Sequence, residues 1–284
     1  MRRTVSFWKM HGAGNDFVLI CDDDASFPQS DAAGMARLCA AHTGIGADGL
    51  ILLQPSDCAD FRMVFFNPDG TPASMCGNGA RCAARLAADL GRAPMHMHIE
   101  TAAGIHRAER LAGDLVRLEL PEPRQAPTAF CVNWEGADYD GWSLNTGVPH
   151  AVIPVRSLAA LDVARFGAFV RHHEWFAPAG TNVDFMERPA EEGAPIAVRT
   201  YERGVEAETL ACGTGVVATA LVALALEWRR SPVEVRTVGG DLLRVEEKPL
   251  RLTGPARYVF RGEVALDDFF SGDGGEATDG SAGG

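Results

Sequence analysis

The segment from Val216 to Leu226, "VVATALVALAL", constrains the fold more than any other part of the chain. It follows the glycine turn "CGTG" and belongs to a predicted helix, "GTGVVATALVALALEWRR". A helix that is apolar on every side must be surrounded by protein rather than lie on a surface. A sheet wrapped around a central helix meets this requirement better than a helix on one face of an open sheet. At 11 residues the apolar run is far short of a membrane span.

The chain also contains a diverged internal repeat. "CGNGARCAARLAADL", which Gly91 closes, aligns with "CGTGVVATALVALAL", and "GAGNDFVLI" aligns loosely with "TGVPHAVIP". Both copies are flanked by β-branched and aromatic stretches that end at Gly, Asp or Pro, which is typical of strands. A further helix, "DAAGMARLCAAHTG", is predicted with Asp31 as its N-cap and Gly44 past its end. Two similar halves, each with a buried helix, are therefore expected.

The length of 284 residues also favours two domains. The Pro-rich stretch 121–130 is the predicted link. We expect an N-terminal half at 1–120, joined by a C-terminal strand at 258–270, and a C-terminal half at 121–257. The Gly/Asp-rich tail 271–284 has no apolar content and is predicted to be disordered.

Charge and cysteine usage exclude several classes of function. A net charge of −12 argues against nucleic acid or an anionic membrane as the main partner. The N-terminus lacks the apolar core of a secretory signal. The seven cysteines include no CxxC pair, so no structural metal is expected, and reduced thiols predict a cytoplasmic protein. Neither of the two lysines lies in a context that suggests pyridoxal phosphate, so no cofactor is predicted.

The two cysteine turns are the candidate chemical centre. Cys76 precedes Gly-Asn-Gly and Cys212 precedes Gly-Thr-Gly, each at the start of a predicted helix. Glycines let backbone N–H groups approach a ligand closely, and a helix N-terminus binds anions such as carboxylates. The same field is expected to lower the pKa of each thiol. One such turn is more often structural, but two in corresponding places favour a function.

Two adjacent thiols have two chemical uses. They can form a disulfide, or they can exchange protons on opposite faces of one carbon. The α-proton of an amino acid is very weakly acidic, so its removal requires donors fixed around the carboxylate. Since neither turn holds a second cysteine to resolve a disulfide, proton transfer is the favoured interpretation.

Six ordered motifs give the chain its resemblance to a known family. They are "FWKMHGAGNDFV", "TGIGADGLILL", "FFNPDGTPASMCGNGARC", "NTGVPHAV", "GTNVDFM" and "TYERGVEAETLACGTG". The chain resembles the diaminopimelate epimerase family over nearly its whole length. The resemblance implies a mixed α/β fold of two pseudo-symmetric domains, each a curled sheet around a central helix. It also implies cofactor-independent interconversion of LL- and meso-diaminopimelate in lysine and peptidoglycan precursor synthesis, often by a homodimer.

The resemblance assigns roles to named positions. Cys76 and Cys212 match the two catalytic acid/base residues, and His150 and Glu202 match positions that tune the thiols. The other matched positions contact the substrate: Asn15, Asn67, Gly77, Asn78, Asn182, Glu202, Arg203, Gly213 and Thr214. From the residues alone, Asn15 and Asn67 read as turn residues and His150 as a packed loop histidine.

Two positions depart from the commoner family pattern. Gly49 stands where some members have a substrate-reaching glutamine, and Val148 stands where many have asparagine. An epimerase of another amino acid, of the proline or hydroxyproline kind, therefore stays an alternative, as does a non-catalytic binding protein on the same scaffold. Among these alternatives, the contexts "MCGNG" and "ERG…ETLACGTG" favour the resemblance to diaminopimelate epimerase.

Overall fold

The computed structural model describes residues 3–189, 191 and 193–270. The predicted tail 271–284 lies outside them. In the first half the elements are β1 Thr4–Gly12, β2 Asn15–Cys21, α1 Ala32–Cys39, β3 Leu50–Gln54, β4 Phe61–Phe66, β5 Pro72–Ala73, α2 Gly77–Asp89, β6 His96–Thr101, β7 Gly104–Arg110 and β8 Leu115–Glu119. The second half contains β9 Thr128–Trp134, β10 Ala137–Asn145, β11 Pro149–Val155, α3 Val163–Arg171, β12 Asn182–Glu187, β13 Ile196–Glu202, β14 Ala207–Thr209, α4 Gly213–Ala225, β15 Val233–Arg236, β16 Leu242–Glu246, β17 Arg251–Pro255 and β18 Arg257–Ala265.

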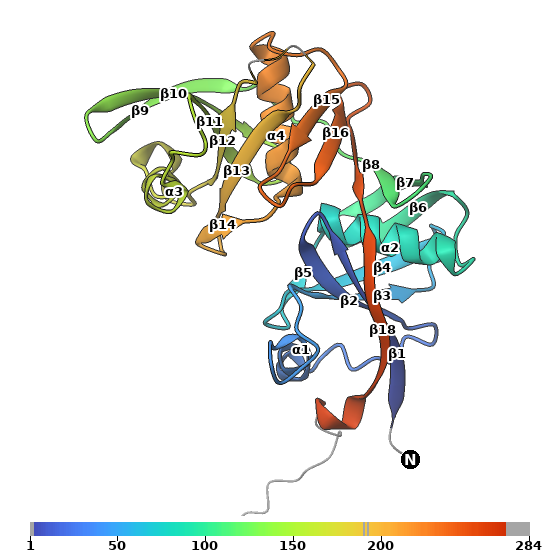
Figure 1. The fold of residues 1–284 in the computed structure, drawn as a ribbon. Coiled ribbons are helices and arrows are strands. Elements are labelled where there is room, and N and C mark those ends of the chain that lie inside the picture. The colour runs from blue at the N-terminus through green and yellow to red at the C-terminus, as the bar shows by residue number, and fades with distance from the viewer. Residues whose placement is uncertain (1–2, 190, 192, 271–284) are drawn as a thin grey trace, which may run out of the picture.

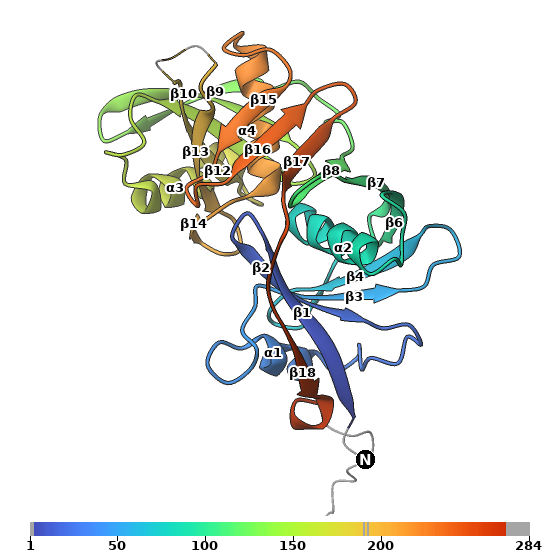
Figure 2. The same cartoon turned by 45° about the vertical axis from the view of Figure 1, so that its right-hand side comes forward.

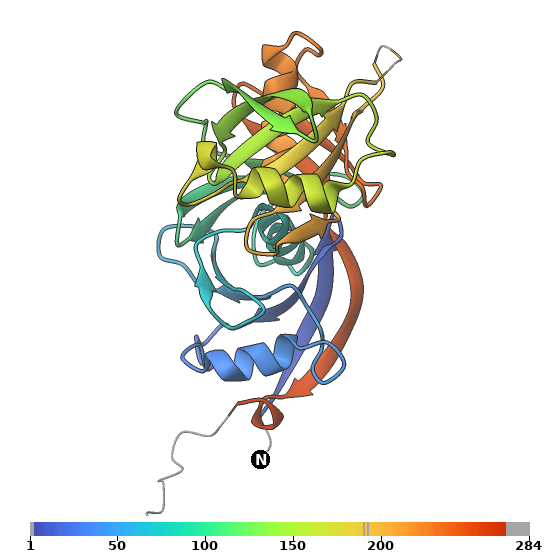
Figure 3. The same ribbon diagram turned by 90° about the vertical axis from the view of Figure 1, so that its left-hand side faces the viewer.

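Each half is a curled, mainly antiparallel sheet around one helix, which confirms the predicted fold class (Figures 1 and 3). In the first half the strands enclose α2, whose alanines Ala80, Ala83 and Ala84 are fully buried. Small side chains let the strands approach the helix closely, and Leu86 fills the remaining core. In the second half α4 occupies the corresponding place, with Val216, Val217 and Val222 buried among residues of β11, β12, β13, β15 and β16.

Two strand pairings connect the ends of the chain to the rest. β18 runs antiparallel to β1 over its whole length, so the last strand completes the first half (Figure 2). β17 pairs antiparallel with β8, with Leu252 opposite Leu118. The strands of the two halves thus form one continuous hydrogen-bonded sheet, while each half keeps its own apolar core. The exact domain boundaries stay a prediction.

The two remaining long helices cover outer faces. α1 packs through Met35 and Leu38 on β2 and β3, and α3 packs through Phe166 and Val170 on β12 and β13. In the part of the chain that is described, no helix is both long and apolar enough to cross a membrane.

The helix ends differ from those predicted. α4 ends at Ala225 and not at Arg230, because Glu227 adopts a left-handed φ of 56°. The N–H groups of Glu227 and Trp228 then turn back to the carbonyls of Leu224 and Ala223 at 3.0 and 2.9 Å. α1 begins after the predicted N-cap, where Asp31 accepts the N–H of Gly34 at 2.7 Å. It ends at Cys39, earlier than predicted, because Ala40 is already extended.

Candidate active site

Cys76 and Cys212 are the N-cap residues of α2 and α4. The sulfur of Cys76 accepts the backbone N–H of Gly79 at 3.5 Å. The sulfur of Cys212 makes no such capping bond and instead lies 3.3 Å from the hydroxyl of Thr214. The two turns are therefore similar in backbone but bind their thiols differently. Cys76 is half-buried, and Cys212 is buried.

The two helix N-termini meet each other across the halves. The side-chain N–H of Asn78, in the first turn of α2, donates to the carbonyl of Ala211 just before α4, at 3.5 Å. A Cβ atom on Gly213 would lie 3.3 Å from the side-chain oxygen of Asn78, so a glycine keeps this approach open. The N-termini of two helices therefore lie next to each other, and helix N-termini are sites that bind carboxylates.

Asn15, at the start of β2, contacts the first turn of α2. Its side-chain oxygen accepts an N–H of Asn78 at 3.3 Å and lies 3.7 Å from the sulfur of Cys76. Its own N–H donates to the carboxylate of Asp48 at 2.8 Å. Asp48 in turn accepts the backbone N–H of Asp16 at 3.0 Å. Because the Asn15 N–H donates to Asp48, the amide oxygen of Asn15 is the end that faces Cys76.

A chain of hydrogen bonds runs from Cys212 into the core of the second half. The hydroxyl of Thr214 lies 2.9 Å from Nε2 of His150, and Nδ1 of His150 lies 2.7 Å from Oδ2 of Asp184. Oδ1 of Asp184 accepts the hydroxyl of Thr200 at 2.7 Å. Since a carboxylate only accepts, Nδ1 of His150 carries the proton and Nε2 is the acceptor. The chain therefore runs from thiol to hydroxyl to imidazole to carboxylate.

Glu202, at the end of β13, interacts with both cysteines. Its negative charge adds to the rise that burial causes in the pKa of both thiols, more strongly at Cys212 than at Cys76. Burial raises the pKa of Glu202, and the neighbouring Cys212 thiol partly opposes that rise. One acidic group is thus shared by the two thiol sites.

The predicted lowering of the thiol pKa values is wrong. Burial raises the pKa of Cys76, although the N–H groups of Gly79 and Asn78 and the charge of Arg81 oppose this. Burial raises the pKa of Cys212 well above its ordinary value, and the negative charges of Glu202 and Asp184 add to the rise. Desolvation disfavours the thiolate by more than the helix N-terminus stabilises it. Both thiols therefore rest in the protonated form at neutral pH.

The other predicted substrate residues are divided between the site and its surroundings. The amide of Asn182 donates to the carbonyl of Pro149 at 3.0 Å and accepts the backbone N–H of Arg203 at 2.9 Å, so it ties together the segments that hold His150 and Glu202. The side chain of Arg203 bonds to the carbonyl of Ala179. Asn67 bonds to Thr71 in the turn between β4 and β5 and makes no hydrogen bond to another candidate within the described ranges.

Comparison with known proteins identifies the family. The profile of the family described as diaminopimelate epimerase matches residues 7–115 and 142–259. The chain belongs to the diaminopimelate epimerase family. It is 42% identical to the diaminopimelate epimerase of Aquifex aeolicus over 276 residues, 92% of this chain and 98% of the relative. It is 41% identical to that of Chlorobaculum tepidum over 264 residues, 90% of this chain and all of the relative.

Solved structures of more distant proteins share the fold of this family member. A hydroxyproline epimerase from Agrobacterium vitis superposes with a TM-score of 0.67 at 18% identity, covering 94% of this chain and 95% of that one. A Bacillus anthracis phenazine biosynthesis protein superposes with a TM-score of 0.69 at 16% identity, covering 92% of this chain and 99% of that one. At such identities the likeness concerns the fold alone.

Gly49, one of the two positions expected to depart from the commoner family pattern, is sterically restricted. A Cβ atom on Gly49 would lie 2.6 Å from the ring of Phe65 and 2.7 Å from the carbonyl oxygen of Phe66. A glutamine therefore does not fit here without movement of β4. The aromatic side chain of Phe65 occupies the space beside this turn.

Sequence reasoning missed two buried charged residues of this family member. Asp184 is fully buried and lies on the same strand as Asn182, two residues on, so strand alternation places both on one face. Arg81 is fully buried in α2, one turn after Gly77. The sequence signal for Arg81 was an arginine between the small residues Gly79, Ala80 and Cys82 of α2. Within the residues described, no cluster of three His, Cys, Asp or Glu side chains could hold a metal ion.

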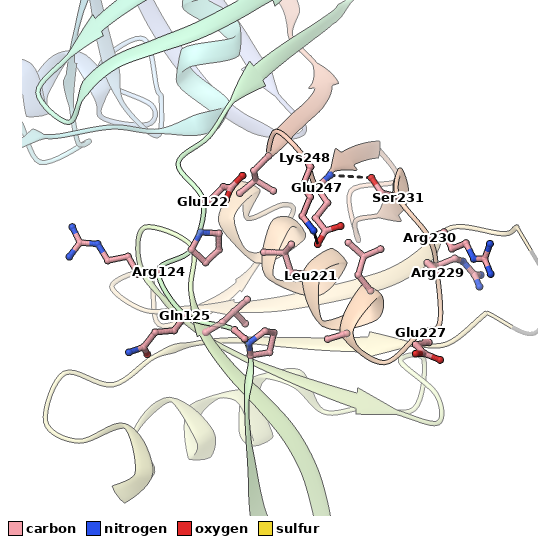
Figure 4. Close-up of a pocket in the computed structure, with 17 residues that line it drawn as sticks. Glu122, Arg124, Gln125, Leu221, Glu227, Arg229, Arg230, Ser231, Glu247 and Lys248 are labelled. Atoms are coloured by element: carbon pink, nitrogen blue, oxygen red, sulfur yellow. Dashed lines mark hydrogen bonds and ion pairs between the residues drawn. The ribbon is translucent and has the colours of Figure 1, made fainter.

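A cavity of about 830 Å³ lies elsewhere, beside the C-terminal end of α4 (Figure 4). Leu221 lies at its centre, and the segment with Glu122 and Arg124 and the turn with Glu247 and Lys248 form its sides. None of the candidate site residues lines it, so it is separate from the two thiols.

Proposed function

We propose that this chain is a cofactor-independent epimerase that interconverts LL- and meso-diaminopimelate by proton transfer between Cys76, Cys212 and the α-carbon. One observation carries the proposal: two cysteines are the N-caps of two helices whose N-termini contact each other through Asn78 and Ala211. The identity of about 40% to named diaminopimelate epimerases over most of the chain supports the choice of substrate.

The chemistry requires one thiolate and one thiol at the same time. The substrate α-carboxylate is held at the N-termini of α2 and α4, which stabilises the negative charge that spreads onto it in the carbanion. One sulfur, as thiolate, takes the α-proton as the C–H bond breaks. The other cysteine gives its S–H proton to the opposite face of the same carbon. After one turnover the protonation states of the two sulfurs are exchanged, and the reverse reaction starts from that form.

Different groups contact the two thiols. For Cys212, the Glu202 carboxyl and the chain through Thr214, His150 and Asp184 receive and return the thiol proton. For Cys76, the N–H of Gly79 and the amide of Asn15 contact the sulfur. Because both pKa values are raised, the thiolate forms only when a neighbouring base removes its proton, and Glu202 is placed to do so.

We further propose a cytoplasmic enzyme of lysine and peptidoglycan precursor synthesis that acts as a homodimer. All seven cysteines are free thiols in the structure, as in a reducing compartment. Val259 and Phe260, on β18, are exposed apolar side chains that a second copy of the chain would cover. Analytical ultracentrifugation of the protein and of Phe260→Asp tests the dimer.

The decisive experiment is incubation of the reduced protein with LL-diaminopimelate in D₂O without added cofactor. Deuterium is expected at the α-carbon, together with the meso form. Cys76→Ala and Cys212→Ala are expected to abolish epimerisation, whereas Cys131→Ala, which removes an exposed thiol on β9, should keep it. Exchange with proline instead of diaminopimelate supports the alternative substrate, and no exchange with either refutes the epimerase.

A further inference from the structure

Arg81 carries a buried positive charge that the proposed proton transfers do not use. Its side chain projects from α2 and is fully buried. Among the described residues none of the ion pairs involves Arg81, and its hydrogen bonds go to two backbone carbonyls and the side-chain oxygen of Asn78. Asp241, whose charge reaches Arg81, is bound to Arg257 at 2.6 Å. A guanidinium stays charged in proteins, and burying a charge without a counter-ion costs free energy. We therefore expect Arg81 to have a local role that offsets this cost.

The guanidinium lies between α2, β1 and β17. Nη2 donates to the side-chain oxygen of Asn78 at 2.8 Å, Nη1 donates to the carbonyl of Gly77 at 3.4 Å, and Nε donates to the carbonyl of Pro255 at 3.4 Å. A Cβ atom on Gly12 would lie 3.3 Å from Nη2, and one on Gly254 would lie 3.2 Å from Nε. Glycines on β1 and β17 thus leave the room that the guanidinium fills.

The bond to Asn78 determines how that amide faces the two turns. Since Arg81 donates to the Asn78 oxygen, the two N–H donors of Asn78 are turned outward. They reach Asn15 at 3.3 Å and the carbonyl of Ala211 at 3.5 Å. A donor whose amide oxygen is bound to a cation carries more positive charge, because hydrogen bonds in a chain polarise one another. The amide therefore presents strengthened donors to Asn15 and to the turn before α4.

The charge of Arg81 also acts unequally on the two cysteines. Burial raises the pKa of Cys76, and the charge of Arg81 partly opposes that rise. The charged groups that act on Cys212 are Glu202 and Asp184, and both are negative. Arg81 lies on the helix that begins at Cys76, which explains the difference.

We propose that Arg81 is a positioning residue that holds the amide of Asn78 with its donors toward Asn15 and the turn before α4, beside the proposed carboxylate position, and that selectively stabilises the Cys76 thiolate. The part that concerns the carboxylate rests on the proposed function; the part that concerns Cys76 does not. In the proposed reaction Cys76 touches the α-carbon and Asn78 lies beside the carboxylate, and Arg81 acts through these two residues.

Two variants separate charge from geometry. Arg81→Met removes both, and Arg81→Lys keeps the charge but loses the planar fork. Arg85→Met is the matched control, because Arg85 lies one turn further along α2 and bonds to Asp89 and Ala256. Alkylation of Cys76 by iodoacetamide, followed by peptide mass spectrometry across a pH series, needs no turnover. The kcat/KM for diaminopimelate and the Tm of each variant are measured in parallel.

We expect Arg81→Met to raise the pH midpoint of Cys76 alkylation by about one pH unit, leave that of Cys212 unchanged, and lower kcat/KM by about 100-fold. Arg81→Lys should keep the Cys76 midpoint and still lose about 10-fold in kcat/KM, mainly through KM. Arg85→Met should match the wild type in both readouts.

Several outcomes overturn the inference. One is an unchanged Cys76 midpoint in a folded Arg81→Met variant, and another is an equal rise for Cys212. If Arg81→Met does not fold, Arg81→Lys decides, and wild-type kcat/KM in that variant overturns the role of the fork. A wild-type protein without epimerase activity whose Cys76 midpoint still depends on Arg81 refutes the proposed function and leaves the effect on Cys76 intact.

Discussion

Replacing Asp184 by asparagine tests the hydrogen-bond chain behind Cys212. The side chain is fully buried, and its two oxygens contact His150 and Thr200 at 2.7 Å each. Asparagine has almost the same shape, so the packing should be kept. Because the hydroxyl of Thr200 donates, the amide oxygen should take the position near Thr200. The amide nitrogen then faces Nδ1 of His150.

This arrangement reverses the tautomer of His150. Facing a donor, Nδ1 must become the acceptor, so the proton moves to Nε2, which points at Thr214. Nε2 can then no longer accept the proton that passes from Cys212 through Thr214. The hydrogen bond lost is one to a charged group, which contributes about 1.5–3 kcal/mol. If that energy is realised in the transition state, kcat/KM falls by about 10- to 160-fold.

The assay is the rate of deuterium incorporation at the α-carbon in D₂O, for both directions of the reaction. Asp138→Asn is the matched control: Asp138 is exposed on β10 and accepts a side-chain N–H of Asn133 at 2.7 Å. That variant should keep the wild-type rate. A folded Asp184→Asn variant with kcat/KM within threefold of the wild type would falsify the reasoning, because the chain would then have no role in the reaction.

Three further predictions follow from the burial of single groups. Glu202 has a raised pKa and serves as base in its ionised form, so kcat/KM should fall as pH falls through that pKa, and Glu202→Gln should remove this limb of the pH–rate profile. Burial raises the pKa of Cys82 from 9.0 to about 12. This thiol therefore stabilises the fold fully below about pH 9, and that stability is lost as pH rises toward its folded pKa. Between about pH 8 and about pH 10.5 the loss should be about 2 kcal/mol, which urea unfolding should detect in the wild type and find reduced in Cys82→Ala. A Cβ atom on Gly215 would lie 2.2 Å from Oδ1 of Asp184, so Gly215→Ala should lower the free energy of unfolding by about 1–3 kcal/mol and reduce kcat/KM, and wild-type values of both would contradict this contact.

Local patterns in the chain predicted the scaffold well, because they depend on short-range chemistry. A helix that is apolar on every side can be stable only when enclosed, and α4 is enclosed by strands. Each cysteine turn is followed directly by a helix, since the glycines free the backbone and the alanines favour helix. The sequence predicted the C-terminal ends of α1 and α4 less well. The left-handed backbone at Glu227, which ends α4, had no sequence signal of the glycine kind.

The candidate site was predictable only where its members lie in repeated or recognisable motifs. Cys76, Cys212 and their glycine turns were found in this way. Asp184 and Arg81 were not, because a single Asp in a strand or a single Arg in a helix is most often exposed. What distinguishes them is complete burial, which no short window of sequence reveals.

By itself the sequence determined two buried helices, each with a cysteine at its N-terminus, within an acidic chain of two similar halves. Tertiary structure decided the electrostatics. Asp184 lies 34 residues from His150 along the chain, but parallel pairing of β11 and β12 brings their side chains together. The local turns favour thiolate, yet the surrounding protein removes water and places negative charge beside Cys212, so its pKa rises. Desolvation sums over all neighbours in space, and the folded chain alone defines them.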